Sequence, residues 1–252
     1  MSDTNPPTHS PAALYAGTSG FAYPSWKPSF YPEKLASAGF LSYYATRLNL
    51  VEVNYTFRRI ASASTFQKWV EATPSGFQFS PKAHMKITHS LKLKNAEEFT
   101  RFFLNSLEPL EQAARLAPIL FQLAPSFKAD LDRLKEFVRL LPREKRYTFE
   151  FRHASWFDEP VYQILRDHNV ALCQAESEKL ESPDVVTADF IYFRLRKEEY
   201  SPAELEALAA RIASHRNEGR SVYALFKHEE TPAGALYAEQ LLAERPPTNP
   251  NP

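Results

Sequence analysis

The sequence predicts a single (β/α)8 barrel of the triosephosphate-isomerase (TIM) type. Eight short apolar segments with the pattern of β-strands are spaced along the chain, and a helical pattern follows most of them. Strands that alternate with helices form a parallel sheet, and eight such units in about 230 residues match the usual size of a closed barrel. An open doubly wound sheet is the alternative. It is disfavoured because no Gly-x-Gly-x-x-Gly motif follows the first strand.

The predicted strands are short runs in which apolar residues alternate with polar ones or stand together between turn residues. In chain order they cover residues 14–19, 50–54, 77–82, 118–123, the first half of 147–156, 170–175, 190–195 and 221–227. The fifth strand shows the alternation clearly. Phe149 and Phe151 point to one side of it, whereas Thr148, Glu150 and Arg152 point to the other.

Capping residues and prolines define the predicted helices. These helices cover residues 34–48, 64–71, a segment from 95 with a break at Pro109, 129–141, 159–168, a segment from 201, and 231–244. Asn95 and Glu98 resemble a capping box, and Pro109 kinks or splits the helix that contains it. We expect loops at residues 21–32 and 55–59 and around His84 and His89, and an irregular acidic segment at 176–184.

Composition limits the class of protein. We expect one barrel domain at residues 14–244 between disordered tails at 1–13 and 245–252, which are polar and contain proline. The N-terminus lacks a signal-peptide pattern, and no apolar run approaches the ~20 residues that cross a bilayer. The single Cys173 lies in an apolar run and permits no internal disulfide. We therefore predict a cytoplasmic protein without a membrane partner. Its formal net charge of zero does not suit the coating of nucleic acid.

Polar residues occupy one side of several predicted strands. The apolar side, with Val51 and Val53 in the second strand, is expected to face the helices. The opposite side would face the barrel interior. It carries Glu52, Asn54, Gln78, Ser80, Lys82, Gln122, Glu150, Arg152, Tyr192, Arg194 and Lys227. Interiors that only support the fold favour Val, Ile and Leu, and an unpaired buried charge costs several kcal/mol. The polar set therefore predicts a pocket at the carboxyl ends of the strands, where such barrels hold their active sites.

The charges predicted at this pocket are mostly positive. The cations are Lys82, Arg152, Arg194, Arg196 and Lys227, and the acids are Glu52 and Glu150. Five cations and two acids give a local charge of +3, to which histidines 89, 153 and 228 could add. A surplus of guanidinium groups suits a phosphate or carboxylate ligand. The alternative is that these groups form internal ion pairs, Glu150 with Arg152 or Arg194 and Glu52 with Lys82.

We hypothesise an enzyme that acts on a phosphorylated or carboxylated small molecule, of hydrolase, lyase or isomerase type, with no reaction assigned. Glu52 or Glu150 would be the general base and His89 or His153 its partner; His153 could equally be a structural, hydrogen-bonded side chain. The predicted ligand-binding residues are Asn54, Lys82, Gln122, Arg152, Trp156, Tyr192, Arg194, Arg196, Lys227 and His228. No cofactor is predicted. A divalent metal is the weaker alternative, because no Asp stands at a strand end.

A second hypothesis is a non-catalytic binder of an anionic metabolite or of single-stranded nucleic acid. Aromatic residues crowd the loops after the first two predicted strands, where some could stack on a base or sugar. They are Phe21, Tyr23, Trp26, Phe30, Tyr31, Tyr55 and Phe57. Zero net charge and the lack of a basic tail make nucleic acid the weaker of the two ligands.

The chain resembles the domain-of-unknown-function family 72, the YecE-like family, over about residues 14–243. The matching motifs include Gly17-Thr18-Ser19-Gly20-Phe21, Val51-Glu52-Val53-Asn54, Leu120-Phe121-Gln122-Leu123-Ala124-Pro125, Phe149-Glu150-Phe151-Arg152-His153 and Tyr192-Phe193-Arg194-Leu195. The resemblance implies a TIM-barrel fold and no established reaction. Where the family usually has His-Gly and a pair of asparagines, this chain has Arg196-Lys197 and Lys227-His228. Both departures add positive charge to the predicted pocket.

Overall fold

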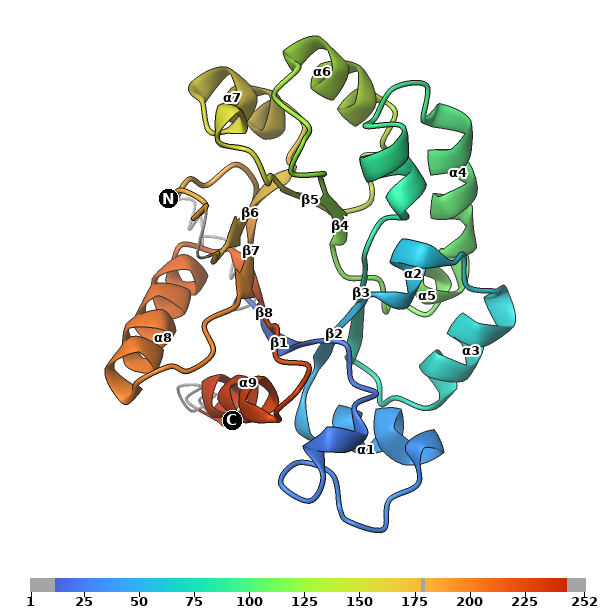
Figure 1. Cartoon of the computed structure of the whole chain (residues 1–252), viewed down its shortest axis with the longest axis vertical. Coiled ribbons are helices and arrows are strands. Elements are labelled where there is room, and N and C mark those ends of the chain that lie inside the picture. The colour runs from blue at the N-terminus through green and yellow to red at the C-terminus, as the bar shows by residue number, and fades with distance from the viewer. Residues whose placement is uncertain (1–11, 178–179, 244–252) are drawn as a thin grey trace, which may run out of the picture.

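Eight parallel strands form a barrel, and helices surround it (Figure 1). The computed structural model describes residues 12–177 and 180–243. Its strands are β1 (Leu14–Ser19), β2 (Leu50–Val53), β3 (Gln78–Pro81), β4 (Ile119–Gln122), β5 (Tyr147–Glu150), β6 (Ala171–Ala175), β7 (Phe190–Leu195) and β8 (Ser221–Phe226). They are hydrogen-bonded in the order β3-β2-β1-β8-β7-β6-β5-β4. The predicted barrel is therefore confirmed, and each strand lies within one or two residues of its predicted bounds.

The barrel closes between β3 and β4, where strand pairing is weakest. Two isolated bridges join the strands across this seam in the described chain, Phe79 with Leu116 and Lys82 with Leu120. Pro81 in β3 and Pro118 just before β4 have no backbone N–H to donate. The hydroxyl of Ser80 instead donates to the carbonyl of Pro118, at 2.6 Å. The ring of strands is thus closed, but with fewer backbone hydrogen bonds at this seam.

Some of the described helices begin at a residue whose side chain caps them, and others do not. The helices are α1 (Phe40–Arg47), α2 (Tyr55–Arg58), α3 (Ala63–Glu71), α4 (Glu97–Ser106), α5 (Glu108–Gln112), α6 (Leu131–Arg139), α7 (Glu159–Asp167), α8 (Pro202–Asn217) and α9 (Ala233–Ala243). Ser201 and Glu204 form the complete capping box that opens α8. Asp130 accepts the backbone N–H of Arg133 at 3.1 Å at the start of α6. Pro109 lies in the first turn of α5, which confirms a break after α4.

Some predicted local structure is wrong. The expected loop at 55–59 contains α2, and the expected loop around His89 contains a π-helical turn, Lys86–Ser90. Each is about one turn long, too short to give a periodic pattern. Asn95 does not cap α4, because its φ of +49° is left-handed and the helix begins at Glu97 without a side-chain cap. The helix expected from residue 34 begins only at Phe40, after a 3-10 turn at Ser37–Gly39.

Apolar residues form two layers of core. The larger layer lies between the strands and the helices. A smaller layer fills the lower part of the barrel interior and consists of Leu50, Ala117, Leu120, Ala171, Cys173, Ala175, Phe190, Tyr192, Tyr223 and Leu225. Cys173 is fully buried, as predicted. Because apolar side chains fill the lower interior, charged side chains are left to the upper part, at the carboxyl ends of the strands.

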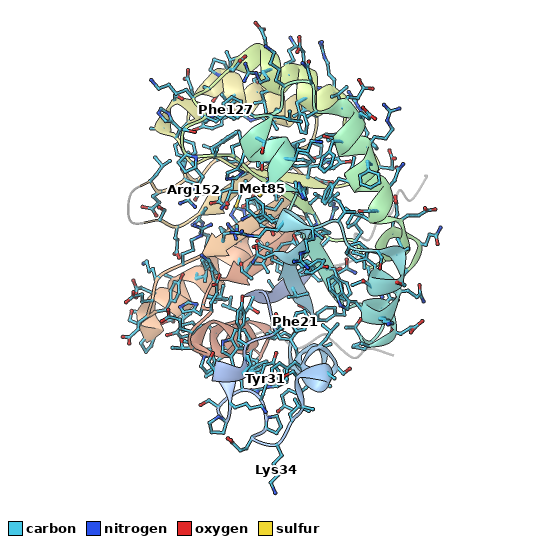
Figure 2. The ribbon with its side chains drawn as sticks, turned by 45° about the vertical axis from the view of Figure 1, so that its right-hand side comes forward. Phe21, Tyr31, Lys34, Met85, Phe127 and Arg152 are labelled. Carbon is cyan, nitrogen blue, oxygen red and sulfur yellow. The ribbon has the colours of Figure 1, made fainter. Side chains whose placement is uncertain are left out.

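The aromatic residues that follow β1 belong mainly to the first layer of core. Trp26, Phe30 and Tyr31 are buried, and Tyr31 stacks on Phe40 with ring centroids 4.2 Å apart. Figure 2 shows Tyr31 in this part of the molecule, well away from Arg152. Of the other aromatic residues in the two loops, Phe21, Tyr23 and Phe57 are half-buried, and Tyr55 is 49% exposed. Part of the set is therefore core packing, and stacking of a base or sugar on the rest stays a prediction.

The predicted tails, residues 1–13 and 245–252, lie outside the described residues apart from Ala12 and Ala13. In the described residues, no helix is both long and apolar enough to cross a membrane.

Candidate functional site

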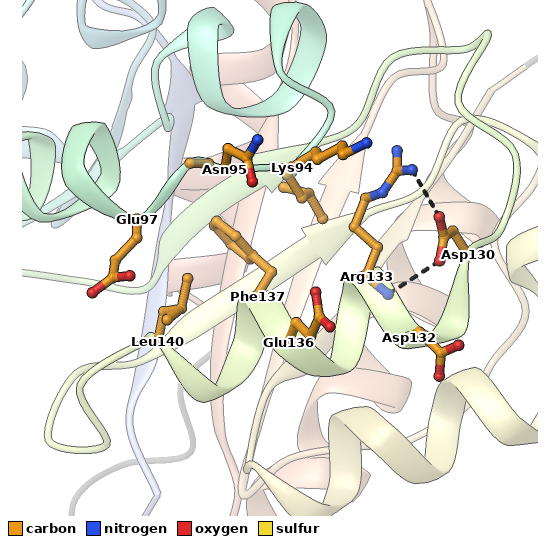
Figure 3. Close-up of a pocket in the computed structure, with 11 residues that line it drawn as sticks. Lys94, Asn95, Glu97, Asp130, Asp132, Arg133, Glu136, Phe137 and Leu140 are labelled. Carbon is orange, nitrogen blue, oxygen red and sulfur yellow. Dashed lines mark hydrogen bonds and ion pairs between the residues drawn. The ribbon is translucent and has the colours of Figure 1, made fainter.

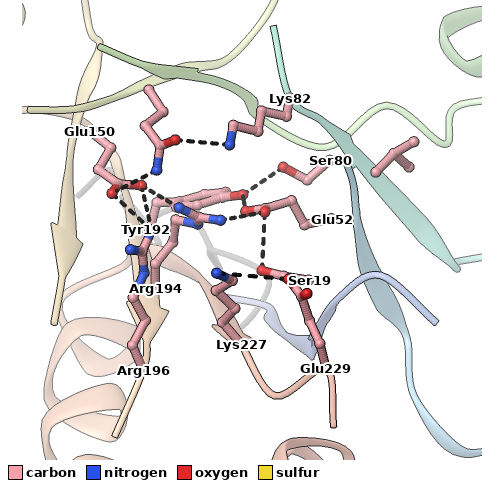
Figure 4. Close-up of polar contacts among 12 residues, drawn as sticks. Ser19, Glu52, Ser80, Lys82, Glu150, Tyr192, Arg194, Arg196, Lys227 and Glu229 are labelled. Carbon is pink, nitrogen blue, oxygen red and sulfur yellow. Dashed lines mark hydrogen bonds and ion pairs between the residues drawn. The ribbon is translucent and has the colours of Figure 1, made fainter. Parts of the chain in front are cut away.

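Two glutamates are buried at the carboxyl ends of the strands and share one arginine. Glu52 comes from β2, Glu150 ends β5, and neither is exposed to solvent. Arg194 from β7 lies between them, with Nη2 2.6 Å from Glu52 Oε1 and Nη1 bound to Glu150 Oε2 (Figure 4). Strands β2, β5 and β7 place these groups above the apolar layer inside the barrel. The predicted pair of Glu150 with Arg194 is present, whereas Glu52 pairs with Arg194 and not with Lys82.

Glu150 binds two further arginines. Its Oε1 accepts from Arg152 Nη1 at 2.9 Å and from Arg196 Nη2 at 2.9 Å, and Gln122 Nε2 donates to the same oxygen at 2.9 Å. Burial alone would raise the pKa of Glu150, but Arg194, Arg196 and Arg152 hold it far below its ordinary value. A carboxylate held this strongly by cations is a weak general base near neutral pH. The role of general base, which we assigned to Glu52 or Glu150, stays a prediction.

Glu52 is held by hydroxyl groups as well as by Arg194. Ser19 Oγ donates to its Oε1 at 3.0 Å, and the Tyr192 hydroxyl donates to Oε2 at 3.3 Å. Tyr192 also lies 2.8 Å from Ser80 Oγ. Burial, and then the charge of Glu52, raises the pKa of Tyr192 well above its ordinary value, so the phenol stays neutral and can donate. These contacts fix Glu52 in place beneath the mouth of the barrel.

Lys82 follows β3 at the seam of the barrel and is buried, with 9% of the residue exposed. Its Nζ donates to Gln122 Oε1 at 2.8 Å and lies 4.2 Å from the centroid of the Phe57 ring. Burial, and next the charge of Arg194, lowers the pKa of Lys82 to about 8. His89 lies against the same Phe57 ring at 5.1 Å, and burial and Lys82 together lower its pKa. The π-helical turn thus brings a neutral imidazole close to the amine.

Six of these side chains form what we call the charged network: Glu52, Lys82, Glu150, Arg152, Arg194 and Arg196. Four cations and two carboxylates give it a formal charge of +2. Arg194 is almost fully buried, but the side chains of Arg152 and Arg196 are 28% and 15% exposed. The cations in excess therefore lie on the solvent side of the buried glutamates.

A cavity of about 910 Å³ opens beside the charged network, at the loops that follow β5 to β8. Its lining residues are Arg152, Glu176, Ser177, Glu181, Arg196, Lys197, Glu198, Glu199, Lys227, Glu229 and Glu230. Four cations and six glutamates give this lining a formal charge of −2. Our predicted local charge of +3 counted strand residues and left out these loop glutamates. The sequence signal for these glutamates was a pair of acids that begins three residues after the end of β7, at 198–199, and of β8, at 229–230.

Glutamates in these loops also position the residues after β7. Glu176 Oε2 accepts the backbone N–H of Arg196 at 2.7 Å and the hydroxyl of Tyr200. Lys227, predicted as ligand-binding, is exposed and lies 3.7 Å from Glu229 Oε1. Asn54, also predicted, is half-buried at the start of α2 and makes no capping bond with its side chain.

Three predicted site residues have structural contacts instead. Trp156 is fully buried and donates from Nε1 to the carbonyl of Phe127 at 2.7 Å. His153 Nδ1 accepts the backbone N–H of Ser155 at 3.2 Å, which caps a 3-10 turn, Ala154–Trp156. His228 packs beside α9 on the outside of the barrel, with Nε2 3.0 Å from the carbonyl of Glu198. None of the three belongs to the charged network.

Another cavity, of about 420 Å³, lies away from the strand ends, between the start of α4 and α6 (Figure 3). Its lining includes Lys94, Glu97 and Glu136, and its Arg133 is paired with Asp130 at 2.9 Å.

In the part of the chain that the structure describes, no group of three or more His, Cys, Asp and Glu residues is arranged to hold a metal ion. The charged network and the cavity beside it are therefore the candidate functional site.

A closed parallel barrel with polar side chains at its carboxyl ends defines a TIM-barrel protein. Residues 15–251 match the model of a family described as "Protein of unknown function DUF72", and the chain belongs to this family, as its motifs predicted. It is 34% identical to the UPF0759 protein YunF of Bacillus subtilis (strain 168) over 160 residues, 60% of this chain and 54% of YunF. It is 29% identical to the UPF0759 protein YecE of Escherichia coli (strain K12) over 145 residues, 57% of this chain and 50% of YecE. The matches thus span about half the length of these curated relatives.

Solved structures agree with this fold. A DUF72 family protein from Thermotoga maritima MSB8 is 30% identical, with a TM-score of 0.80 over 92% of this chain and 98% of that one. An AP endonuclease of family 2 from Brucella melitensis is 10% identical, with a TM-score of 0.55 over 93% of this chain and 100% of that one. At this identity the endonuclease shows the shared barrel fold alone.

Proposed function

We propose that the mouth of the barrel binds a phosphorylated or carboxylated small molecule and that the protein is an enzyme acting on it. The observation that carries this proposal is the charged network, in which four cations meet two carboxylates. Arg152 and Arg196 line the cavity, and their side chains are 28% and 15% exposed. An anionic group bound there would balance the surplus charge and accept charge-assisted hydrogen bonds. Lys82 and His89 would supply the titratable groups, because Glu150 is too weak a base.

The six glutamates that line the cavity restrict the ligand to a small anion. A polyanion would have to lie along loops that carry Glu198, Glu199, Glu229 and Glu230, and like charges repel. A small molecule can place one anionic group against Arg152 and Arg196 without covering these loops. The same argument opposes single-stranded nucleic acid. We expect no binding of a single-stranded oligonucleotide at low salt, measured by fluorescence anisotropy.

Thermal unfolding with candidate anions tests the proposal. Inorganic phosphate, pyrophosphate, glycerol phosphate, malate and citrate would each be added at low ionic strength, with and without Mg²⁺. A ligand at 100 times its Kd stabilises the folded state by about 2.7 kcal/mol, so we expect one phosphate or carboxylate to raise the Tm. Arg196→Met should abolish that rise. The control Arg101→Met, at an exposed position on α4, should not. No shift with any of these anions, or an undiminished shift in Arg196→Met, would contradict the proposal.

A further inference from the structure

The backbone and stem of Lys82 are fixed, and its amine has few partners. The carbonyl of Lys82 accepts from Thr56 Oγ1 at 2.7 Å, and its N–H donates to Val53 O at 3.2 Å. The bridge to Leu120 ties the same residue to β4. Among the six members of the charged network, Lys82 alone forms no ion pair with a described carboxylate. Its Nζ donates to the neutral amide of Gln122 and lies over the ring of Phe57. The amine is therefore positioned without being neutralised.

Gln122 connects this amine to the arginines. Its Oε1 accepts from Lys82 Nζ, and its Nε2 donates to Glu150 Oε1, the oxygen that also binds Arg152 and Arg196. The amine of Lys82 and the guanidinium groups of Arg152 and Arg196 thus lie on opposite sides of one Gln122–Glu150 contact, as Figure 4 shows for Lys82, Glu150 and Arg196. A molecule whose anionic group binds the arginines could present a neighbouring carbon atom to Lys82.

The surroundings of Lys82 also favour its neutral form. Burial comes first and the positive charge of Arg194 second in lowering its pKa to about 8. A substantial fraction of the amine is then uncharged at mildly alkaline pH, and the uncharged amine is the nucleophile. Lysines made reactive in this way, by burial and by a neighbouring cation, form Schiff bases with carbonyl compounds.

We propose that Lys82 forms a Schiff base with an anionic aldehyde, ketone or 2-oxo acid whose phosphate or carboxylate is held by Arg152 and Arg196. The inference rests on the proposed function and names its substrate class. The amine nitrogen bonds to the carbonyl carbon, and the C=O electron pair moves to oxygen, which takes up a proton while nitrogen loses one. The resulting carbinolamine then releases its oxygen as water, leaving a C=N bond. His89, a neutral imidazole near the amine, is placed to carry these protons.

Reductive trapping tests the Schiff base directly. The protein would be incubated with dihydroxyacetone phosphate or pyruvate at pH 8 and treated with sodium borohydride, which reduces C=N to a stable secondary amine. We expect a stoichiometric mass increase that peptide mapping assigns to Lys82. Lys86 is the internal control, since it also lies over an aromatic ring, 4.4 Å from the centroid of Phe99, but is exposed. Its labelling should be at least about tenfold lower, because its amine is exposed to water and lies outside the charged network.

Two variants separate chemistry from anion binding. Lys82→Arg keeps a cation at the site but cannot form the imine, so the adduct should disappear while the thermal shift with phosphate remains. Lys86→Arg should leave the adduct unchanged. The inference is overturned if wild-type protein is stabilised by the probes yet gives no adduct at Lys82, or if Lys82 and Lys86 are labelled equally. If no anion raises the Tm, the proposed function fails instead, and an adduct at Lys82 would then show a reactive amine without the arginine clamp.

Discussion

Arg194 allows two carboxylates to stay charged inside the barrel. Glu52 and Glu150 are unexposed, and the Arg194 side chain between them is 2% exposed. Taking a charge out of water costs several kcal/mol unless a partner compensates for it. The arginine serves both carboxylates at once, with a nitrogen for each. The geometry of this contact is therefore a structural requirement as much as a feature of the site.

Replacing Arg194 should destabilise the protein strongly. Arg194→Met leaves Glu52 buried without a cation, and breaking a buried ion pair costs about 3–5 kcal/mol. Arg152→Met is the matched control. Arg152 is 28% exposed, and Glu150 would still bind Arg194, Arg196 and Gln122. Its loss should cost less than about 1 kcal/mol. Urea unfolding at pH 7 measures both values, and an equal loss in the two variants would show that Arg152 is part of the scaffold.

The buried carboxylate of Glu150 should make stability depend on acid. The arginines hold its pKa far below the ordinary 4.5 in the folded state. A group whose folded pKa is depressed stabilises the fold above the unfolded pKa, and this contribution is lost as pH falls below that value. Wild-type protein should therefore lose stability from about pH 4.5 downward.

Glu150→Gln isolates this effect. At pH 7 the variant should be less stable by about 3–5 kcal/mol, because its arginines lose a buried partner. The difference between wild type and variant should shrink steadily below about pH 4.5. Urea unfolding at several pH values provides the test. A difference that stays constant down to pH 3 would contradict the assigned pKa direction.

At the scale of elements, the strands were the most predictable part of the chain. Residues that alternate, such as those of 147–150, point to two different faces of the sheet. The pattern therefore predicts both the strand and the direction of its side chains. Single-turn elements such as α2 gave no pattern to detect. The Asn95 cap failed for a different reason. Its side chain is a suitable acceptor, but the backbone before α4 passes through left-handed residues at Lys92, Leu93 and Asn95.

Contact between β1 and β2 depends on one glycine. Gly17 is in register with Leu50, and a Cβ at this position would lie 1.7 Å from Leu50 O and 2.7 Å from the hydroxyl of Tyr44. Neither strand can move away without breaking its ladder. Overpacking commonly costs 1–3 kcal/mol and sometimes more, so Gly17→Ala should cost about 3 kcal/mol or prevent folding.

Gly39→Ala is the matched control for this substitution. Its Cβ would meet only the side chain of Leu35, with Cδ1 at 3.0 Å and Cγ at 3.7 Å, and that side chain can turn away. Its φ is −90°, which alanine readily adopts. We expect a change within about 1 kcal/mol. Urea midpoints compare the two variants directly, and similar midpoints would mean that β1 and β2 have more freedom than their contact suggests.

At the scale of the whole molecule, the sequence predicted where charged side chains gather but not how they pair. The polar strand ends predicted where charged groups would gather, because parallel strands share one carboxyl edge. The alternation pattern could not predict which of these groups would form ion pairs with each other. Glu52 and Arg194 are 142 positions apart, and Lys82 was an equally good partner in charge. The glutamates of the cavity lie in loops, whose course is not determined by strand alternation. The predicted positive charge is therefore present in the charged network but not in the lining of the cavity.

The barrel as a whole is weakest at the seam between β3 and β4. Backbone bonds across it in the described chain run from Phe79 to Arg115, from Ala117 to Phe79 and from Ala83 to Leu120, each 2.8 Å long. By contrast, β7 and β8 pair through six residues in continuous register. Side chains supplement the seam, because Ser80 donates to Pro118 O and Lys82 to Gln122. The candidate site thus spans the least strongly paired part of the ring.

Hydrogen exchange should detect this asymmetry. Local opening exposes the amides of weakly paired segments first, so Phe79, Ala83 and Ala117 should exchange at least about tenfold faster than the paired amides of β7 and β8. Ser80→Ala removes a 2.6 Å hydrogen bond across the seam and should raise the exchange rates of the seam amides relative to those of β7 and β8. The amides of β7 and β8 provide the reference within the same sample. A ligand that binds both Lys82 and the arginines of β5 and β7 would connect the two sides of the seam. It should therefore lower the ratio of the exchange rates of the seam amides to those of β7 and β8. Uniform exchange around the barrel would mean that the side-chain contacts compensate fully for the hydrogen bonds that Pro81 and Pro118 cannot make.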